Sequence, residues 1–458
     1  MEPTDTRSRR SSSRRPDAAL LLVLAPWGLL AARQEPPQPP ASPPTFVITG
    51  PGAERLGVPD CVPRRGDEAS RVACRTLTEV LRNDLKFEGL FRFVPESLMA
   101  SLPALNVDSP DLIAWKGVGA TVLVASRAEV TGGELSVEVR VHSVGSGQMM
   151  LSKRYSGRAD NPRIFAHQAS DEIMALAGNR GVARTKIAFA SDRDSTSGAR
   201  AKRTKELYIC DYDGFNPRRV TVNGSLNILP AWSPDGRSLA YVSYRQGTPS
   251  IFVALIYEGR SANITTGATG GSFAPSFSPD GKRIAYASSR GGNMDIWIAN
   301  ADGSSAHRIT TSPGLDTAPY WSPTGQEIAF TSDRSGSPQI YLMDNEGLNV
   351  RRLSNVGSWN DAPTWNPSKQ FSEIAYTSRL ENVQFEVAVI DLATRQVRQV
   401  SQGRGSCESP SWAPSGRHLV FSCQRGGAWQ LTVADRLGVN MQVLSTGPGN
   451  NVHPDWGP

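Results

Sequence analysis

The chain has 458 residues, so the usual size of about 150 residues per domain predicts two or three folded units with room for a buried core. Its 42 glycines and 33 prolines favour many short strands joined by turns. The 49 basic and 43 acidic residues leave a net charge of +6, an excess too small for this length to support nucleic-acid binding by charge alone.

Residues 1–33 have the pattern of a secretory signal peptide. Five arginines precede an uninterrupted apolar run over residues 18–32. The run is shorter than the roughly 20 apolar residues that span a bilayer as a helix, which disfavours the alternative of a membrane anchor. Six arginines against three acidic residues place a net charge of +3 in residues 1–33. Half of the basic excess of the chain therefore belongs to the predicted signal.

Residues 34–45 follow as a proline-rich arm, in which residues 34–44 have the sequence QEPPQPPASPP. Proline fixes φ and removes the backbone N–H donor, so this segment favours a semi-extended polyproline conformation over helix or sheet. We expect it to act as a tether or a docking peptide.

Residues 46–184 combine helical and strand-like patterns, which predicts a small α/β domain. Apolar residues at helical spacing predict a first helix that contains Ala73, Leu77, Leu81 and Leu85. A strand-like run covers residues 120–125, and apolar residues alternate over residues 135–141. A second helix is predicted over residues 163–177, with Asp160 or Asn161 as its N-cap.

From Pro230 onward one phrase recurs with a period of about 44 residues, which predicts the blades of a β-propeller. The full copies are PAWSPDGRSLAYVS (230–243), PSFSPDGKRIAYAS (275–288), PYWSPTGQEIAFTS (319–332), PTWNPSKQFSEIAYTS (363–378) and PSWAPSGRHLVFSC (410–423). Each unit supplies an aromatic strand, a Pro-Asp-Gly type turn, a β-rich strand and two further strands. We expect the recurrent Trp, Phe and Pro residues to pack the blades.

The two ends of this array predict that it closes on itself. TKIAFAS at 185–191 matches the second strand of a unit but has no aromatic strand before it, whereas the truncated copy PDWGP at 454–458 is such a strand. Pairing the two closes a ring of six blades over residues 185–458 and leaves no exposed edge between the first and last blades. The predicted chain is therefore multidomain, with an α/β domain followed by an all-β propeller.

The order of signal, α/β domain and propeller resembles the TolB family, whose members are periplasmic components of the Tol-Pal envelope system. The similarity covers residues 46–458 and includes ELYICDYDGFNPRRVT at 206–221, NDLKFEGLF at 83–91 and HQASDEI at 167–173. The SPDG phrase also occurs in propellers of peptidases, so the resemblance depends on the order of all these segments.

This resemblance implies a non-enzymatic adaptor that needs no cofactor. In the family, the propeller binds the peptidoglycan-associated lipoprotein Pal, and an N-terminal arm contacts the inner-membrane protein TolA. The system maintains outer-membrane integrity and constricts the envelope at cell division. Here residues 34–44 take the place of that arm without aligning to it, so a TolA-like partner is implied without residue-level contacts. We expect a monomer within a larger envelope complex.

Propeller geometry predicts the face on which a partner binds. The turns between second and third strands open on the same face as the segments that enter the innermost strands. Each of these turns carries one arginine: Arg193, Arg245, Arg290, Arg334, Arg379 and Arg425. The entering segments carry Asn227, Phe273, Ala274, Asp316, Thr317, Asn360, Asp361 and Glu408.

The predicted partner-binding set takes members from both groups, and the resemblance aligns Ala274 and Thr317 with contact positions of the family. The other members are Phe273, Asp316, Asn360, Asp361, Arg245, Arg290, Arg334 and Arg379. We expect the arginines to steer an acidic partner. The alternative is that they pair within their own blades or remain solvated.

Two other classes of function stay open: a propeller-type relative of hydrolases that lacks the catalytic domain, and a glycan-binding or sensing propeller. No G-x-S-x-G motif occurs in the sequence, and the five histidines lack metal-ligand spacing, so no catalytic or metal-binding residue is predicted. Asp211-x-Asp213-Gly214 is expected to form a hairpin turn, since the later glutamate of a calcium loop is missing. The tryptophans outside the repeated packing position are too dispersed to define a sugar groove: Trp115, Trp297, Trp359 and Trp429.

Five cysteines in an exported chain permit disulfides. If Trp412 lies opposite His418 in the hairpin of the fifth repeat, then Cys407 lies opposite Cys423, which predicts a cross-strand disulfide. Cys61 and Cys74 form a second candidate pair that no register supports. Cys210 is expected to remain free.

Overall fold

The computed structural model of the chain describes residues 54–195, 204–380, 384–401, 403, 405–444 and 446–458. The predicted signal peptide and the proline-rich arm lie outside these residues. Among the described helices, none combines the length and the apolar character needed to cross a membrane.

The first part of the described chain is an α/β domain built on one mixed sheet. Its strands lie in the order β3-β1-β4-β5-β6, and β2 pairs with β4. The elements are β1 (Arg55–Gly57), β2 (Val62–Pro63), α1 (Glu68–Phe87), β3 (Arg92–Phe93), α2 (Glu96–Ala100), α3 (Leu112–Gly117), β4 (Val122–Thr131), β5 (Glu134–Ser143), β6 (Met149–Arg158) and α4 (Arg163–Leu176).

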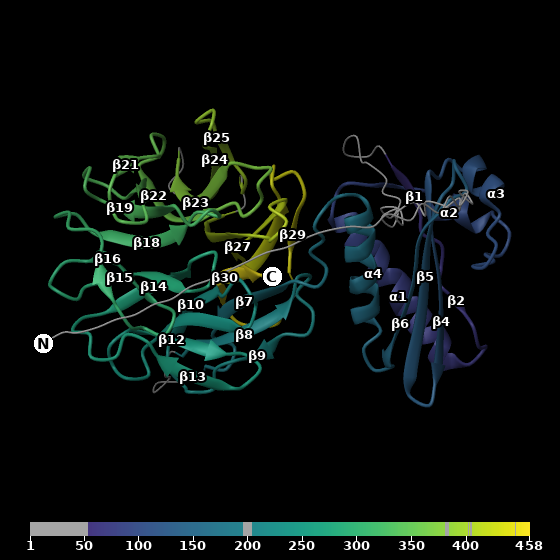
Figure 1. Ribbon diagram of the computed structural model, residues 1–458, viewed down its shortest axis with the longest axis horizontal. Coiled ribbons are helices and arrows are strands. Elements are labelled where there is room, and N and C mark those ends of the chain that lie inside the picture. Colours follow the sequence, from purple (N-terminus) through teal and green to yellow (C-terminus); the bar gives the residue numbers. More distant parts are fainter. Residues whose placement is uncertain (1–53, 196–203, 381–383, 402, 404, 445) are drawn as a thin grey trace, which may run out of the picture. The chain divides into compact units, whose positions relative to one another are not determined.

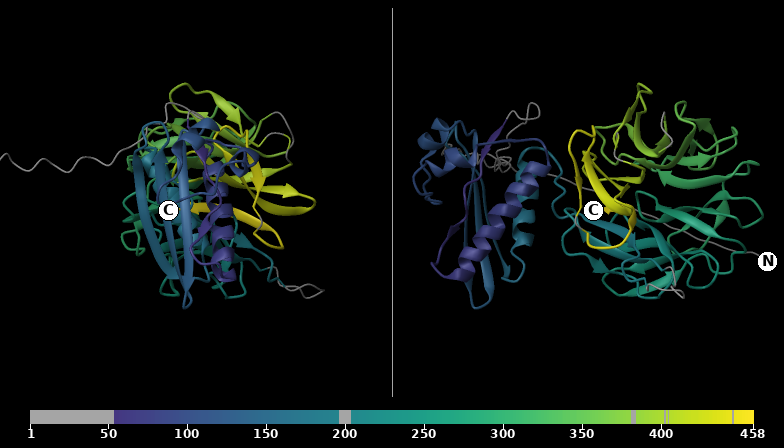
Figure 2. Two further views of the ribbon diagram at one scale, coloured as in Figure 1. Left: turned by 90° about the vertical axis from the view of Figure 1, so that its right-hand side faces the viewer. Right: turned by 180° about the vertical axis from the view of Figure 1, so that it is seen from behind.

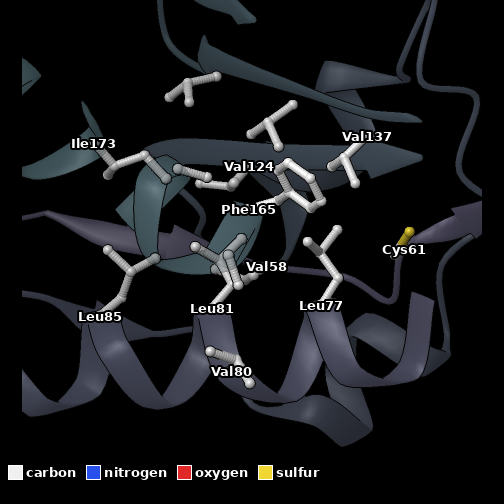
Figure 3. Close-up of a cluster of buried hydrophobic side chains, with 14 of the residues drawn as sticks. Val58, Cys61, Leu77, Val80, Leu81, Leu85, Val124, Val137, Phe165 and Ile173 are labelled. Atoms are coloured by element: carbon white, nitrogen blue, oxygen red, sulfur yellow. The ribbon is translucent and has the colours of Figure 1, made fainter. Parts of the chain in front are cut away.

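Helices α1 and α4 pack against each other and against one face of this sheet (Figure 2). Figure 3 shows Leu77, Leu81 and Leu85 of α1 pointing toward Val124 and Val137 of the sheet. The predicted apolar helix face and the predicted strand alternation are confirmed, since their residues are at most 4% exposed. Burial of each of these leucine and valine side chains contributes about 1.5–3 kcal/mol.

Two boundaries in this domain differ from the sequence predictions. β4 continues to Thr131, because its pairing with β5 extends as far as Thr131 opposite Glu134. Helix α4 has Pro162 at the N-cap position and no side-chain capping bond, so the prediction of Asp160 or Asn161 as N-cap is wrong. The Asp160 carboxylate instead accepts hydrogen bonds from Arg158.

The described residues after the α/β domain form six four-stranded antiparallel sheets, which are the blades of a β-propeller (Figure 1). From the innermost strand outward, blade 1 contains β30 (Asn451–Gly457), β7 (Lys186–Ser191), β8 (Glu206–Asp211) and β9 (Arg218–Arg219). Blade 2 contains β10 (Asn227–Trp232), β11 (Ser238–Ser243), β12 (Ser250–Leu255) and β13 (Arg260–Asn263). Blade 3 contains β14 (Ser272–Phe277), β15 (Arg283–Ser288), β16 (Asp295–Asn300) and β17 (His307–Arg308).

The remaining blades have the same order of strands. Blade 4 contains β18 (Asp316–Trp321), β19 (Glu327–Ser332), β20 (Gln339–Asp344) and β21 (Arg351–Arg352). Blade 5 contains β22 (Trp359–Trp365), β23 (Glu373–Arg379), β24 (Glu386–Asp391) and β25 (Val397–Gln399). Blade 6 contains β26 (Cys407–Trp412), β27 (His418–Arg425), β28 (Ala428–Asp435) and β29 (Met441–Val443).

Strand β30 closes the propeller by pairing with β7. The innermost strands contact one another in succession, and β30 contacts both β26 and β10. The predicted ring of six blades and its closure by the last strand are therefore confirmed. Trp456 of β30 is 5% exposed, and its indole N–H donates to Thr185 Oγ1 at 2.8 Å.

Each innermost strand carries the same β-bulge immediately before its proline. In β14 the register shifts between Phe273 and Ser276, so that Ala274 and Pro275 together lie opposite Tyr286. A left-handed backbone costs roughly 1–2 kcal/mol at a non-glycine residue. The packing of the blades must therefore impose the positive φ values, between 47° and 57°, of Leu229, Ala274, Ala318, Ala362, Ser409 and His453.

Trp456→Ala will lower the free energy of unfolding by about 3–5 kcal/mol, because it leaves a cavity on the strand that joins the two ends of the propeller. Urea unfolding followed by circular dichroism measures the change. Trp359→Ala is the matched control, since Trp359 is 39% exposed and its removal should cost about 1 kcal/mol or less. Equal losses in the two variants would contradict the special role of the closing strand.

Candidate functional site

Two sets of turns meet at one end of the propeller. In blade 4, Arg334 in the turn after β19 donates from Nη2 to both carboxylate oxygens of Asp316 at 2.9 Å, and Asp316 begins β18. In blade 1, Arg193 Nη2 donates to Asn451 Oδ1 at 2.9 Å. The turns after the second strands therefore lie beside the starts of the innermost strands, as predicted. We call this end the arginine face, defined by Arg193, Arg245, Arg290, Arg334, Arg379 and Arg425.

Five of the six arginines of this face stack on aromatic rings of their own blades. The distances from guanidinium carbon to ring centroid are 4.2 Å for Arg193 over Tyr208, 3.8 Å for Arg245 over Phe252, 5.2 Å for Arg290 over Trp297, 5.1 Å for Arg334 over Tyr341 and 4.6 Å for Arg379 over Phe385. Such stacking contributes about 0.5–1 kcal/mol at exposed sites. It fixes the side chain without neutralising its charge.

The same arginines differ in their polar partners. Arg334 forms an ion pair with Asp316, whose side chain is fully buried. Arg193 uses the neutral amide of Asn451. Within the described part of the chain, four members have no carboxylate at ion-pair distance: Arg245, Arg290, Arg379 and Arg425. The alternative that the arginines pair within their own blades therefore holds for Arg334. The four arginines without a carboxylate partner leave positive charge on the face.

One residue near the start of each innermost strand is at most 1% exposed: Asn227, Ser272, Asp316, Asn360, Cys407 and Asn451. Asn360 donates to Gln339 Oε1 at 2.8 Å and accepts from Ser378 Oγ at 2.6 Å. Asp316 and Asn360, two members of the predicted partner-binding set, therefore have no free surface to offer a partner. Four other members of the predicted partner-binding set lie just after the buried residues near the starts of their strands and are partly exposed: Phe273, Ala274, Thr317 and Asp361.

Hydroxyl groups support this face in blades 4 to 6, and the sequence analysis missed them. Each lies at the fifth position of a second strand and binds the bulge region of the next blade: Thr331 Oγ1 donates to Asp361 Oδ1 at 2.9 Å, Thr377 Oγ1 accepts from Ser409 N at 3.0 Å, and Ser422 Oγ accepts from His453 N at 3.1 Å. Blades 1 to 3 have Ala190, Val242 and Ala287 at this position. The sequence did contain a signal for these hydroxyl groups, because the fifth residue of the second strand is Ala or Val in blades 1 to 3 and Thr or Ser in blades 4 to 6.

Carboxyl groups also lie in the innermost strands. Burial raises the pKa of Glu408, and the nearby charge of Asp361 raises it further. Burial likewise raises the pKa of Asp455, although Trp232 N at 2.7 Å and Ser411 Oγ at 2.8 Å donate to its carboxylate. A carboxyl group with a raised pKa takes up a proton at a higher pH than an exposed carboxyl group does.

Two arrangements that are common in catalytic sites are absent from the described residues. No histidine side chain there hydrogen-bonds a serine or cysteine side chain, and no three potential metal ligands gather. Burial lowers the pKa of His418 and of His453 to about 4, so both are neutral at pH 7. Gly214 N donates to Asp211 O at 2.9 Å, which is the predicted hairpin turn. The face can offer cations and apolar surface to a partner.

A disulfide joins Cys407 and Cys423 in blade 6, where the two residues lie directly opposite each other with Cα atoms 4.1 Å apart. The predicted pair is confirmed, but its premise is wrong, because Trp412 lies opposite Leu419 and not opposite His418. The bulge between Glu408 and Ser411 shifts the register by one residue and so brings the cysteines together. Cys61 and Cys74 also form a disulfide, and Cys210 is free and buried.

Comparisons with known proteins match both parts of the chain. The model of the TolB beta propeller domain matches residues 173–458, and that of the TolB amino-terminal domain matches residues 45–150. The Tol-Pal system protein TolB of Desulfosudis oleivorans is 33% identical over 199 residues, which are 43% of this chain and 44% of the relative. That of Geobacter metallireducens is 37% identical over 195 residues, 42% of this chain and 43% of the relative. These matches span less than half of the curated relatives.

A solved structure agrees over a greater length. The crystal structure of TolB from Acinetobacter baumannii has a TM-score of 0.75 at 28% identity, covering 89% of this chain and 98% of that one. The fold, a small α/β domain followed by a six-bladed propeller, is that of TolB structures. Since the propeller model alone matches more than half of the residues, the chain belongs to the TolB family.

Proposed function

We propose that this chain is a non-enzymatic periplasmic adaptor of the Tol-Pal envelope system, and that its arginine face binds the peptidoglycan-associated lipoprotein Pal. The matching relatives are named Tol-Pal system proteins. The observation that carries the proposal is that Phe273, Ala274 and Thr317 are partly exposed at an end of the propeller that bears unpaired arginines. Apolar surface bordered by charge is the usual composition of a protein interface. As an adaptor, the chain supports outer-membrane integrity and envelope constriction at cell division.

The predicted partner-binding residues have different tasks in this proposal. Phe273, Ala274, Thr317 and Asp361 contact the lipoprotein, and the imposed positive φ of Ala274 holds its strand in the required shape. Asp316 and Asn360 support the contact residues without touching the partner, because Asp316 orients Arg334 while Asn360 binds Gln339 and Ser378. The arginines without carboxylate partners, Arg245, Arg290, Arg379 and Arg425, raise the rate at which an acidic partner associates.

A TolA-like inner-membrane protein is the proposed second partner, bound through the proline-rich arm of residues 34–45. The two alternative functions have less support. A hydrolase requires a nucleophile and a base within hydrogen-bond reach, and the described residues bring no such pair together. A sugar groove requires several exposed aromatic rings side by side. Of the candidate tryptophans, Trp115 is buried, Trp359 is 39% exposed, and Trp297 and Trp429 are partly buried in two other blades.

Thr317→Arg will weaken the binding of purified peptidoglycan-associated lipoprotein about tenfold or more, because a long charged side chain enters the proposed contact. Isothermal titration calorimetry measures the change. Lys282→Glu is the matched control, since Lys282 is exposed in the turn between β14 and β15, at the opposite end of the propeller. A folded Thr317→Arg variant with unchanged affinity would contradict the proposal that the lipoprotein binds to the arginine face.

Reversal of charge at two unpaired arginines tests the steering role separately. Arg290→Glu combined with Arg379→Glu will lower the association rate constant about tenfold at low salt, and the difference will shrink as salt screens the charges. Stopped-flow fluorescence at several ionic strengths measures both effects, with Lys282→Glu again as control. A change confined to the dissociation rate and independent of salt would assign these arginines to direct contact.

A further inference from the structure

The turn between the third and fourth strands is shorter in blade 2 than in every other blade, because the pairing of β12 with β13 extends as far as Leu255 opposite Arg260. The hairpin itself has the same length as that of blade 3, since Phe252 pairs with Asn263 and Trp297 with Arg308. The turn of blade 2 comprises residues 256–259, between Leu255 and Arg260. The same turn comprises residues 301–306 in blade 3 and 345–350 in blade 4. Blades 1, 5 and 6 use residues 212–217, 392–396 and 436–440.

In three other blades this turn seals the junction with the preceding blade. Its glycine packs on the backbone that follows the fourth strand of that blade, so closely that an added Cβ would collide with a carbonyl oxygen: Gly303 on Ile264, Gly347 on Ile309, and Gly438 on Val400. The corresponding residue of blade 1 is Val220. In blade 2 the equivalent position, three residues after the third strand, is occupied by Glu258. The next residue, Gly259, does not reach Val220, since a Cβ there would meet no atom within 4 Å.

The missing contact leaves a cleft of about 770 Å³ between blades 1 and 2. Its apolar lining includes Ile209, Val220, Trp232 and Ala254. The indole N–H of Trp232 is buried and has no hydrogen-bond partner. The volume lies within the range of about 300–1,000 Å³ that is usual for ligand sites. The cleft is thus large enough for a side chain and its adjoining backbone, with a donor available for a carbonyl group.

Basic side chains surround this apolar lining. They are Lys186, Arg218, Arg219, Arg245 and Arg260, whereas Asp211 is the sole acidic residue among the described residues that line the cleft. Asp211 pairs with Lys186, Arg219 with Glu206, and Arg260 with Glu258. Neither Arg218 nor Arg245 has a carboxylate at ion-pair distance in the described chain. The cleft therefore combines an apolar interior with uncompensated positive charge.

Exposed apolar residues extend the cleft onto the surface. Tyr257 and Val222 line it and are 83% and 77% exposed. An exposed apolar patch beside a cleft is typical of a site that binds another protein. A phosphate or another small anion would use the arginines but would leave the apolar lining and these two side chains without a role.

We propose that the cleft between blades 1 and 2 binds an acidic peptide segment of a partner protein, with one apolar or aromatic side chain anchored against Trp232 and Val220. The carboxylates of the segment pair with Arg218 and Arg245, and one of its carbonyl groups accepts from the Trp232 indole. This site is separate from the lipoprotein contact at Phe273, Ala274 and Thr317, although Arg245 belongs to the arginine face as well.

Selection of a displayed random dodecapeptide library on the whole propeller-containing chain tests this proposal. We expect enrichment of acidic sequences that contain an apolar or aromatic residue. A resynthesised, fluorescently labelled peptide is then titrated by anisotropy. Arg218→Glu should weaken its binding about tenfold or more. Arg351→Glu, at the equivalent position of blade 4, should leave the binding unchanged.

A second variant tests the cleft without changing Arg218 or Arg245. Residues 256–261 are replaced by the sequence of residues 301–306, which gives blade 2 the turn of blade 3 without changing the length of the hairpin. The new turn should close the cleft and abolish peptide binding, while an unchanged thermal unfolding midpoint and unchanged lipoprotein binding report an intact fold.

Four outcomes would overturn the proposal. They are a selection that enriches no peptide, enriched peptides without acidic residues, peptide binding that survives both Arg218→Glu and the turn replacement, and full displacement of the peptide by inorganic phosphate. Loss of peptide binding with Thr317→Arg but not with Arg218→Glu would show that the peptide binds to the arginine face and not in the cleft. Failure of lipoprotein binding alone leaves this test unaffected, since the two measurements use different ligands and different variants.

Discussion

The pairing of β30 with β7 is the interaction on which the rest of the propeller depends. It joins residues 451–457 to residues 186–191, so blade 1 exists only when the two ends of the array have met. The arginine face depends on it too, because Arg193 comes from one end and its partner Asn451 from the other. Loop closure over such a distance costs entropy, and the burial of Trp456 with its bond to Thr185 helps to offset that cost.

Within the closed ring, the bulge before each innermost proline links the repeated architecture to the candidate site. Two residues of the innermost strand, such as Ala274 and Pro275, lie opposite one residue of the second strand. The shift bends the strand just after its buried first residue and exposes the residues that follow. The left-handed backbone at six non-glycine positions is costly, and the surrounding blades must supply the compensating contacts.

The proposed binding sites arise where the blades depart from their common pattern. Hydroxyls support the bulges in blades 4 to 6, whereas alanine and valine occupy the same position in blades 1 to 3. Arg334 is neutralised by Asp316 while the arginine of blade 3 is not. The short turn of blade 2 opens a cleft that Gly303, Gly347 and Gly438 seal elsewhere. A symmetric scaffold thus presents an asymmetric surface, which a partner can bind in one orientation.

Blade number, ring closure and the apolar faces of the α/β domain could all be predicted from the amino-acid order, because each depends on a periodicity or a spacing along the chain. The prediction of the Cys407–Cys423 pair rests on a wrong register, and the bulge between Glu408 and Ser411 is what places the two cysteines opposite each other. The opposition of Trp412 and Leu419, the burial of Asp316 and Asn360, the different partners of the arginines and the cleft beside Trp232 could not be predicted. Each of these depends on how one strand or blade packs against another. A one-residue bulge or a longer strand pairing that tightens one turn changes such packing while it leaves the repeated pattern of the sequence almost intact.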